Sequence, residues 1–396
     1  PINILATTDK ENDIFSIIEE KDWIFMHPYC SFEPVIELIN KAADDENVVA
    51  IKQLLYRVSP DSPIIKALIR AAEKGKYVSV VVELKARFDE TRNINWAKQL
   101  EDAGAHVVYG ISRLKTHGKA LLIIKRTKKG IKRYAHLATG NYNEQTAKIY
   151  TDFSFFTSDE HIGEDISTLF NLLTGFSLPT GWNYITIAPL DLRIKFKMLI
   201  SREIENAKKG LKAKIIAKMN SLADREIAEL LYSASQAGVK IDLIVRGICI
   251  VRPNIKKISE NITVRSIVGR FLEHARIYYF HNNGSPEYFL SSADWMSRNL
   301  DQRIEILFPI IDEKVKEIIQ KVLEFQLEDN VNSWLLESTG KYKQNHSKKS
   351  KEHNSFEKIY NFFLKHEKKI EHKHILEKLL TPKKSNALST STGEEK

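Results

Sequence analysis

The sequence has 396 residues, a hydrophobic fraction of 43%, a formal net charge of +9 and a pI of about 9.1. This length is too great for one ordinary core and indicates two domains with a tail. No apolar run reaches the roughly 18 residues of a membrane helix, no signal-peptide pattern is seen, and Cys30 and Cys249 suggest no disulfide framework. These features argue against a membrane-spanning or disulfide-rich secreted protein and predict a cytoplasmic location.

Helices and strands alternate along the first half of the chain. Apolar spacing and glycine stops predict helices over 33–45, 62–76 and 93–105, and strands over 48–57, 77–87, 106–110 and 117–126. Such alternation is typical of a helix-covered, largely parallel sheet.

The second half repeats this order. We predict strands over 213–221, 241–251, 261–268 and 274–280, and a helix over 225–240. The fold class is therefore α/β, with two duplicated domains of mixed, mostly parallel sheets. We place the first domain at 1–180 and the second at 181–335.

The remaining segment, 336–396, is basic and polar. We predict that it is mostly disordered, with an amphipathic helix over 356–380. This segment carries part of the chain's positive charge. The remaining positive charge favours a polyanionic partner such as nucleic acid, an anionic membrane, a nucleotide or a phosphate polymer.

A histidine followed two residues later by a cation stands at the start of one strand in each half. His117 and Lys119 lie in "KTHGKALLI", and His274 and Arg276 lie in "LEHARIYYF". The histidines are 157 residues apart, close to the 163 residues between the helix-ending glycines of the two halves. We therefore expect the two histidines to occupy equivalent positions in the duplicated domains.

One carboxylate follows each histidine at the start of a later strand, Asp152 in the first half and Glu305 in the second. A carboxylate that accepts one ring N–H fixes the histidine tautomer and leaves the other nitrogen nucleophilic or basic. We predict the pairs His117–Asp152 and His274–Glu305. Paired histidines with nearby Lys and Arg suit phosphoryl transfer, in which the cations neutralise the phosphoryl oxygens.

At these residues the chain resembles the polyphosphate kinase family, in its two C-terminal domains of phospholipase-D-like fold. The resemblance covers roughly residues 10–330 and includes "QLLYRVSPDSPI", "VVELKARFDE", "LKTHGKALLI", "TGNYNEQTAKIYTDFSFFT", "VRGICIVRP" and "FLEHARIYYF". It implies that His117 takes the γ-phosphate of ATP and that His274 acts as acid or base.

The same resemblance assigns residues to the nucleotide and its metal. Tyr150 and Arg246 match nucleotide-contacting positions, while Arg57 and Arg87 match arginines beside a Mg²⁺–phosphate group. The implied partners are ATP, ADP and inorganic polyphosphate, with Mg²⁺ as cofactor, and no nucleic acid is expected. Full family members carry a helical N-terminal domain and a head domain before this region. Their homo-oligomers and a peripheral membrane association are further expectations of the resemblance.

Two alternatives use the same residues. A phospholipase-D-type phosphodiesterase typically has His-x-Lys-x4-Asp in both halves, but Ile124 stands at the aspartate position and Arg276 replaces the second lysine. An inactive polyanion-binding fragment would show salt-sensitive binding without turnover.

Overall fold

The computed structural model describes residues 1–2, 13–59, 61–83, 90–110, 114–175, 179–346 and 351–380. The elements of the first half are, in chain order, α1 (Ile14–Glu20), β1 (Trp23–His27), α2 (Glu33–Asp44), β2 (Val48–Leu55), α3 (Pro63–Glu73), β3 (Tyr77–Val82), α4 (Glu90–Asp102), β4 (His106–Val108), β5 (Lys115–Thr116), β6 (Ala120–Thr127), β7 (Gly130–Ala138), η2 (Thr146–Lys148), β8 (Tyr150–Thr157) and α5 (Glu160–Leu173).

The elements of the second half come after α5 in the chain. Its elements are β9 (Thr186–Ala188), α6 (Leu192–Lys208), β10 (Lys214–Met219), α7 (Arg225–Gln236), β11 (Lys240–Val245), β12 (Ile262–Ile267), β13 (Leu272–Glu273), β14 (Arg276–Phe280), η3 (Asn282–Gly284), β15 (Glu287–Ser291), α8 (Ser297–Asp301), β16 (Arg303–Ile310), α9 (Glu313–Leu327), β17 (Ser333–Leu336), β18 (Tyr342–Gln344) and α10 (Ser355–Leu380).

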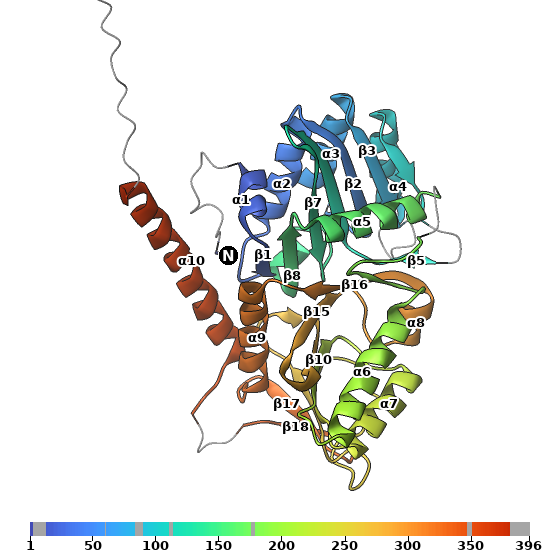
Figure 1. The fold of residues 1–396 in the computed structure, drawn as a ribbon, viewed down its shortest axis with the longest axis vertical. Coiled ribbons are helices and arrows are strands. Elements are labelled where there is room, and N and C mark those ends of the chain that lie inside the picture. The colour runs from blue at the N-terminus through green and yellow to red at the C-terminus, as the bar shows by residue number, and fades with distance from the viewer. Residues whose placement is uncertain are drawn as a thin grey trace, which may run out of the picture.

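Each half builds its own sheet, so the two duplicated α/β domains predicted from the sequence are confirmed. The first sheet has the order β1-β8-β7-β6-β2-β3-β4, and β13 of the second half also pairs with β8. The second sheet has the order β18-β17-β12-β11-β10-β14-β15-β16-β5, and β9 also pairs with β16, so each sheet takes one short strand from the other half. Figure 1 shows the first domain above the second, with α5 crossing the front of the first sheet. In both halves a histidine-bearing segment leads into a strand, β6 or β14, that lies beside the first parallel strand, β2 or β10.

The prediction that the sheets are mostly parallel is wrong, although they are mixed as expected. Within each domain parallel pairing runs through β2-β3-β4 or β10-β11-β12, and the pairs β6–β7, β7–β8, β14–β15 and β15–β16 are antiparallel. The cause is the connection between strands. Helix α3 joins the parallel strands β2 and β3, whereas β6 and β7 form a hairpin that turns at residues 127–130.

Apolar side chains join the two domains. One buried cluster contains residues of both halves, and Phe155 of β8 stacks on Phe308 of β16 with their ring centroids 5.8 Å apart. A second cluster fills the interior of the second domain. Because the first cluster crosses the boundary, the domains are held in one arrangement across the segments that carry the two histidines.

Two elements, β18 and α10, lie in the described part of the segment after residue 335. Strand β18 pairs antiparallel with β17 and extends the second sheet past the predicted domain end. Backbone hydrogen bonds make this pairing, so it needs no apolar side chains. The helix predicted over 356–380 is present as α10, which runs beside α9 and projects from the two domains (Figure 1).

Among the described residues no helix is long and apolar enough to cross a membrane. Cys30 and Cys249 are both free thiols.

Candidate active site

Two very short strands cross from one domain to the other. Strand β5 pairs in parallel with β16 of the second domain, and β13 pairs in parallel with β8 of the first. His117 directly follows β5, and its backbone N–H donates to the carbonyl of Ile304 over 2.9 Å. His274 directly follows β13, and its N–H donates to the hydroxyl of Thr151 over 3.1 Å. Each histidine is therefore fixed against a strand of the opposite domain.

Because β5 and β13 pair with strands of the opposite domain, each histidine contacts a carboxylate of the other half. His117 Nδ1 lies 2.9 Å from Glu305 Oε2, and His274 Nδ1 lies 2.7 Å from Asp152 Oδ2. The predicted pairs His117–Asp152 and His274–Glu305 are wrong. The prediction assigned each carboxylate to the histidine of its own half, but Asp152 lies on β8 beside β13, and Glu305 lies on β16 beside β5. The two carboxylates still orient the two histidines, with exchanged partners.

Burial sets the protonation state of the His117–Glu305 pair. Burial lowers the pKa of His117 well below its usual value, and the charges of Lys119, Arg276 and Arg303 act in the same direction. Burial also raises the pKa of Glu305 to about 7, against hydrogen bonds and cations that lower it. When Glu305 is ionised it accepts Nδ1–H from a neutral imidazole. The lone pair of His117 is then on Nε2, the nitrogen suited to nucleophilic attack.

The pKa of the carboxyl group shifts in the opposite direction in the His274–Asp152 pair. Burial raises the pKa of Asp152, but His274, Arg276 and the Thr139 hydroxyl outweigh it, so the net shift is downward. Burial also lowers the pKa of His274, although Asp152 opposes that shift. Asp152 is thus a firmly ionised acceptor, whereas Glu305 titrates near neutral pH. This asymmetry fits one nucleophilic histidine and one acid–base histidine.

Two of the predicted phosphate-binding cations, Lys119 and Arg276, are buried beside the histidines. Lys119 and Arg276 are only 2% and 4% exposed, and burial lowers the pKa of Lys119 to about 7. Arg276 donates to Asp294 Oδ1 over 3.1 Å and to the carbonyls of Thr139 and His274. Lys119 and Arg276 each donate to the backbone carbonyl of the histidine two residues earlier, and so place buried positive charge beside His117 and His274.

Arg246 is partly exposed and is tied to the same network. Its Nε donates to Asn220 Oδ1 over 2.7 Å, and the amide of Asn220 donates to Asp294 over 3.1 Å. Because Asp294 also holds Arg276, one chain of hydrogen bonds links the two guanidinium groups. Arg246 is thus connected through Asn220 and Asp294 to Arg276, two residues after His274.

Aromatic rings flank both histidines. Tyr150 lies 5.3 Å from His274 between ring centroids, which places this predicted nucleotide-contacting residue in the site. Tyr56 lies edge-on to His117 at 5.2 Å, and the Arg57 guanidinium lies 5.3 Å from the Tyr56 ring. Tyr56, just after β2, thus lies against both His117 and the Arg57 guanidinium. Arg87 lies outside the described residues.

Comparison with known proteins adds the family. The family model Polyphosphate kinase C-terminal domain 1 matches residues 13–179, and the model Polyphosphate kinase C-terminal domain 2 matches residues 185–356. This chain belongs to the polyphosphate kinase family.

Relatives in the polyphosphate kinase family are longer than this chain. Polyphosphate kinase 1 of Chlorobaculum tepidum is 52% identical over 342 residues, which cover 86% of this chain and 49% of that protein. The polyphosphate kinase of Prosthecochloris aestuarii is 54% identical over 330 residues, which cover 83% of this chain and 46% of that protein. The chain spans about half the length of the curated relatives it matches.

Solved structures agree with this assignment. The crystal structure of polyphosphate kinase from Porphyromonas gingivalis superposes with a TM-score of 0.87 and 38% identity, covering 93% of this chain and 57% of that one. Phosphatidylserine synthase from Haemophilus influenzae Rd KW20 has a TM-score of 0.53 and 11% identity, covering 91% of this chain and 96% of that one. The second likeness shows a shared fold alone.

Sequence reasoning missed the groups that hold the two carboxylates of this polyphosphate kinase family member. The hydroxyl of Thr139 donates to Asp152 Oδ1 over 2.8 Å, and the hydroxyl of Ser292 donates to Glu305 Oε2. Asn299 also donates to Glu305. Each hydroxyl precedes its carboxylate by 13 residues. That equal spacing in the two halves is a signal that could have revealed them.

A buried ion pair between Lys218 and Glu273 lies next to His274. Lys218 Nζ lies 2.8 Å from Glu273 Oε2, with both side chains at most 3% exposed, and it donates to the carbonyl of Ala275 over 3.2 Å. Glu273 also accepts from Thr151 over 3.0 Å. Lys218 therefore contacts the residues before and after His274, which makes it a positioning residue.

We expect Lys218→Met to lower the free energy of unfolding by about 3–5 kcal/mol, because it leaves the Glu273 charge buried without its cation. Urea unfolding measures this, and the double variant Lys218→Met/Glu273→Gln should recover most of the loss. Lys208→Met is the control: its pair with Glu205 is exposed, so a change of about 0.5 kcal/mol or less is expected. Equal effects of Lys218→Met and Lys208→Met would contradict the role of the buried pair.

Proposed function

We propose that this chain transfers the terminal (γ) phosphate of ATP reversibly to a growing inorganic polyphosphate chain through a phosphohistidine at His117. The observation that carries the proposal is the 2.9 Å contact of His117 Nδ1 with Glu305 Oε2, in a chain of the polyphosphate kinase family. That contact leaves Nε2 as the nucleophile.

The first displacement forms a phosphoenzyme. His117 Nε2 attacks the γ-phosphorus while the bond from that phosphorus to the β–γ bridging oxygen breaks, and ADP leaves with the electron pair. The ring becomes positively charged as the N–P bond forms, and the Glu305 carboxylate stabilises this charge through Nδ1–H. His274, oriented by Asp152, exchanges a proton with the leaving oxygen.

The second displacement passes the phosphoryl group on. A terminal oxygen of the polyphosphate chain attacks the phosphorus, the N–P bond breaks, and the lone pair returns to Nε2. His274 then serves the entering oxygen in place of the leaving one. The N–P bond of a phosphohistidine is reactive, so the same two steps run in reverse when polyphosphate and ADP are in excess.

The surrounding cations favour anionic substrates in both steps. Lys119 and Arg276 are buried beside the histidines, and both lower the pKa of His117. The same positive charge stabilises phosphoryl oxygens as they gain charge in the transition state. We propose that Tyr150 and Arg246 contact the nucleotide and that Lys119 and Arg276 act on its phosphates from behind.

Magnesium enters this proposal as part of the Mg·ATP substrate. Among the described residues no group of three His, Cys, Asp or Glu side chains could hold a metal ion. Asp152 and Glu305 are already engaged by the two histidines. Phosphate oxygens would therefore supply most ligands of the ion, with Arg57 and Arg87 holding those phosphates.

The test is transfer of label from γ-labelled ATP to protein in the presence of Mg²⁺. Wild type should carry acid-labile, base-stable label, and His117→Ala should carry none. His106→Ala, which changes an exposed histidine, should be labelled like wild type. Wild type without label would contradict the phosphohistidine. Nucleotide release without protein labelling would favour the phosphodiesterase alternative, and salt-sensitive binding alone would favour a binding fragment.

A further inference from the structure

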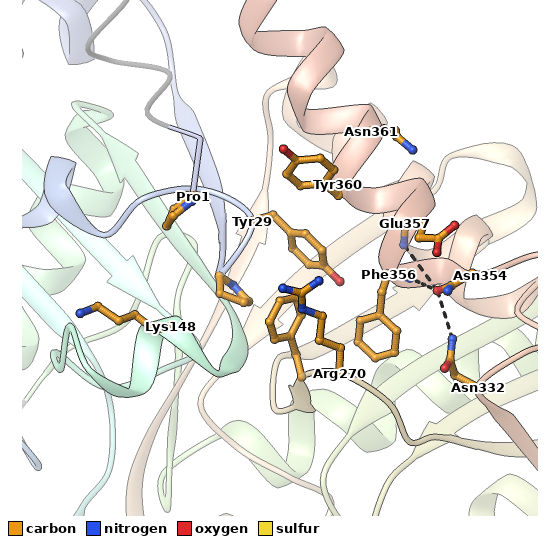
Figure 2. A pocket seen from close by; sticks show the side chains of 12 residues that line it. Pro1, Tyr29, Lys148, Arg270, Asn332, Asn354, Phe356, Glu357, Tyr360 and Asn361 are labelled. Atoms are coloured by element: carbon orange, nitrogen blue, oxygen red, sulfur yellow. Dashed lines mark hydrogen bonds between the residues drawn. The ribbon is translucent and has the colours of Figure 1, made fainter.

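A cavity of about 770 Å³ lies where both domains meet α10 (Figure 2), and neither His117 nor His274 is among its lining residues. Its walls come from the β1–α2 turn, from η2, from the loop before β13 and from the first turns of α10. The lining residues used below are Tyr29, Lys148, Arg270, Phe271, Phe356 and Tyr360. A cavity of this size is within the range of roughly 300–1,000 Å³ that is typical of small-molecule sites.

Aromatic rings form much of the cavity wall. Phe271 packs edge-on against Tyr29 at 5.5 Å and against Phe356 at 5.9 Å between ring centroids. Tyr360 adds a ring that is 47% exposed, on the side of α10 that faces the cavity (Figure 2). Tyr29 and Phe356 are buried, so the rings open to a ligand are those of Phe271, which is partly buried, and Tyr360. Such ring faces suit a flat aromatic ligand.

Two cations complete the lining. The Arg270 guanidinium lies 5.4 Å from the Phe271 ring centroid, and Arg270 is exposed. Lys148 is also exposed and lies across the cavity from Tyr360 in Figure 2, with its ammonium pointing away from Arg270. That ammonium donates to Gln145 Oε1 over 3.3 Å and would have to rotate to meet the same ligand. Glu357 is the acidic residue in this lining. Aromatic faces beside two cations fit a ligand that has both an aromatic ring and negative charge.

One buried hydroxyl in the lining has no protein partner. Tyr29 is 3% exposed, and its hydroxyl makes no hydrogen bond to any described residue. Buried hydroxyl groups are nearly always hydrogen-bonded, because leaving one unpaired costs free energy. The hydroxyl oxygen is itself covered by protein atoms, so Tyr29 contributes its ring to the cavity wall and its hydroxyl is not a ligand contact.

The cavity is close in sequence to the catalytic strands. Phe271 directly precedes β13, which ends one residue before His274, and Lys148 lies two residues before Tyr150. Strands β13 and β8 pair at Leu272 and Tyr150. A ligand in the cavity would therefore touch both segments that lead to the His274–Asp152 pair.

We propose that this cavity binds a nucleoside phosphate, with the base against the rings of Phe271 and Tyr360 and the phosphates at Arg270 and Lys148. The proposal does not rest on the chemistry at His117. A bare phosphate polymer would leave the aromatic wall unused, and an uncharged aromatic compound would leave Arg270 and Lys148 unused. The nucleoside phosphate is the class that uses both.

The experiment measures binding of ADP, adenosine and tripolyphosphate to the full chain by isothermal titration calorimetry. Tyr360→Ala should weaken ADP and adenosine about tenfold or more at one site, because base stacking is lost. Arg270→Gln should weaken ADP and tripolyphosphate but leave adenosine unchanged. Tyr29→Phe should bind ADP like wild type without lowering stability, because the covered hydroxyl neither reaches the cavity nor has a protein partner to lose.

The controls separate this cavity from the rest of the surface and from the histidines. Tyr109→Ala and Arg225→Gln remove an exposed tyrosine and an exposed arginine elsewhere, and both should bind ADP like wild type. Arg246→Ala should leave the site intact. Unchanged ADP binding in Tyr360→Ala and Arg270→Gln would overturn the proposal. So would loss of the same site in Arg246→Ala, or tripolyphosphate binding that ignores Tyr360, which would indicate an anion site only.

Discussion

Glu305→Gln should slow phosphorylation of His117 by roughly 10²- to 10⁴-fold, the range over which positioned acid–base groups act. Asn299 donates to Glu305 Oε1, whereas Ser292 and His117 Nδ1 both lie at Oε2. A glutamine that keeps the Asn299 bond has its oxygen at the Oε1 position, so its amide would face His117 Nδ1. An amide donor there forces the proton of the ring onto Nε2, which removes the nucleophilic lone pair. Rapid-quench labelling with γ-labelled ATP measures the rate.

The pH profile gives a second readout of the same variant. Below about pH 7 Glu305 becomes protonated, since burial raises its pKa to about 7, and it no longer accepts Nδ1–H. The wild-type rate should therefore rise with pH through about 7. At higher pH loss of the Lys119 charge should lower it, because burial brings the pKa of Lys119 to about 7 as well. Glu305→Gln should lack the rising limb and keep the alkaline decline.

Nitrogen-15 NMR of the histidine rings tests whether the carboxylates are crossed. Glu305→Gln should change the tautomer of His117, and Asp152→Asn should change that of His274. Glu313→Gln, at an exposed carboxylate, should change neither. If Glu305→Gln altered His274 and spared His117, the crossed arrangement and the mechanism built on it would both fail.

The order of elements was readable from the sequence because local signals determine it. Helix α3 and helix α7 each end before a glycine, Gly75 or Gly238, that has a positive φ of 78° or 98°. Strands β2, β3, β10 and β11 are short apolar runs between such helices. These features recur in both halves, so duplication and the equivalence of His117 and His274 followed directly.

The crossed pairing was not readable because no local signal encodes it. Strands β5 and β13 have two residues each, too few to show alternation, and their partners lie in the other domain. Sequence comparison of the halves shows which positions are equivalent, but it does not show whether equivalent groups meet within a half or across the boundary. The sequence also could not show whether the strands after β4 pair in parallel or antiparallel. A hairpin and a crossover both begin with a strand, so the strand pattern alone is the same for the two.

Gly140 in "TGNYN" is another residue whose role only the structure reveals. A Cβ added there would lie 2.2 Å from Asp152 Oδ2 and 2.3 Å from its Cγ, far inside van der Waals contact. The carboxylate can move away only by giving up its bonds to Thr139 and His274. Gly140→Ala should therefore lose about 1–3 kcal/mol of stability, as overpacked sites do. We also expect phosphoryl transfer to fall by roughly 10²-fold as His274 loses its orientation.

Gly181→Ala is the matched control, since a Cβ at Gly181 meets no atom within 4 Å. Thermal unfolding, the transfer rate and the His274 ring signals should all change in Gly140→Ala and stay constant in Gly181→Ala. The second half carries Ala293 at the position equivalent to Gly140, with the same spacing of 153 residues that relates Asp152 to Glu305. The steric demand is thus specific to the Asp152 side. Unchanged His274 signals in Gly140→Ala would show that Asp152 has room to move and does not position His274.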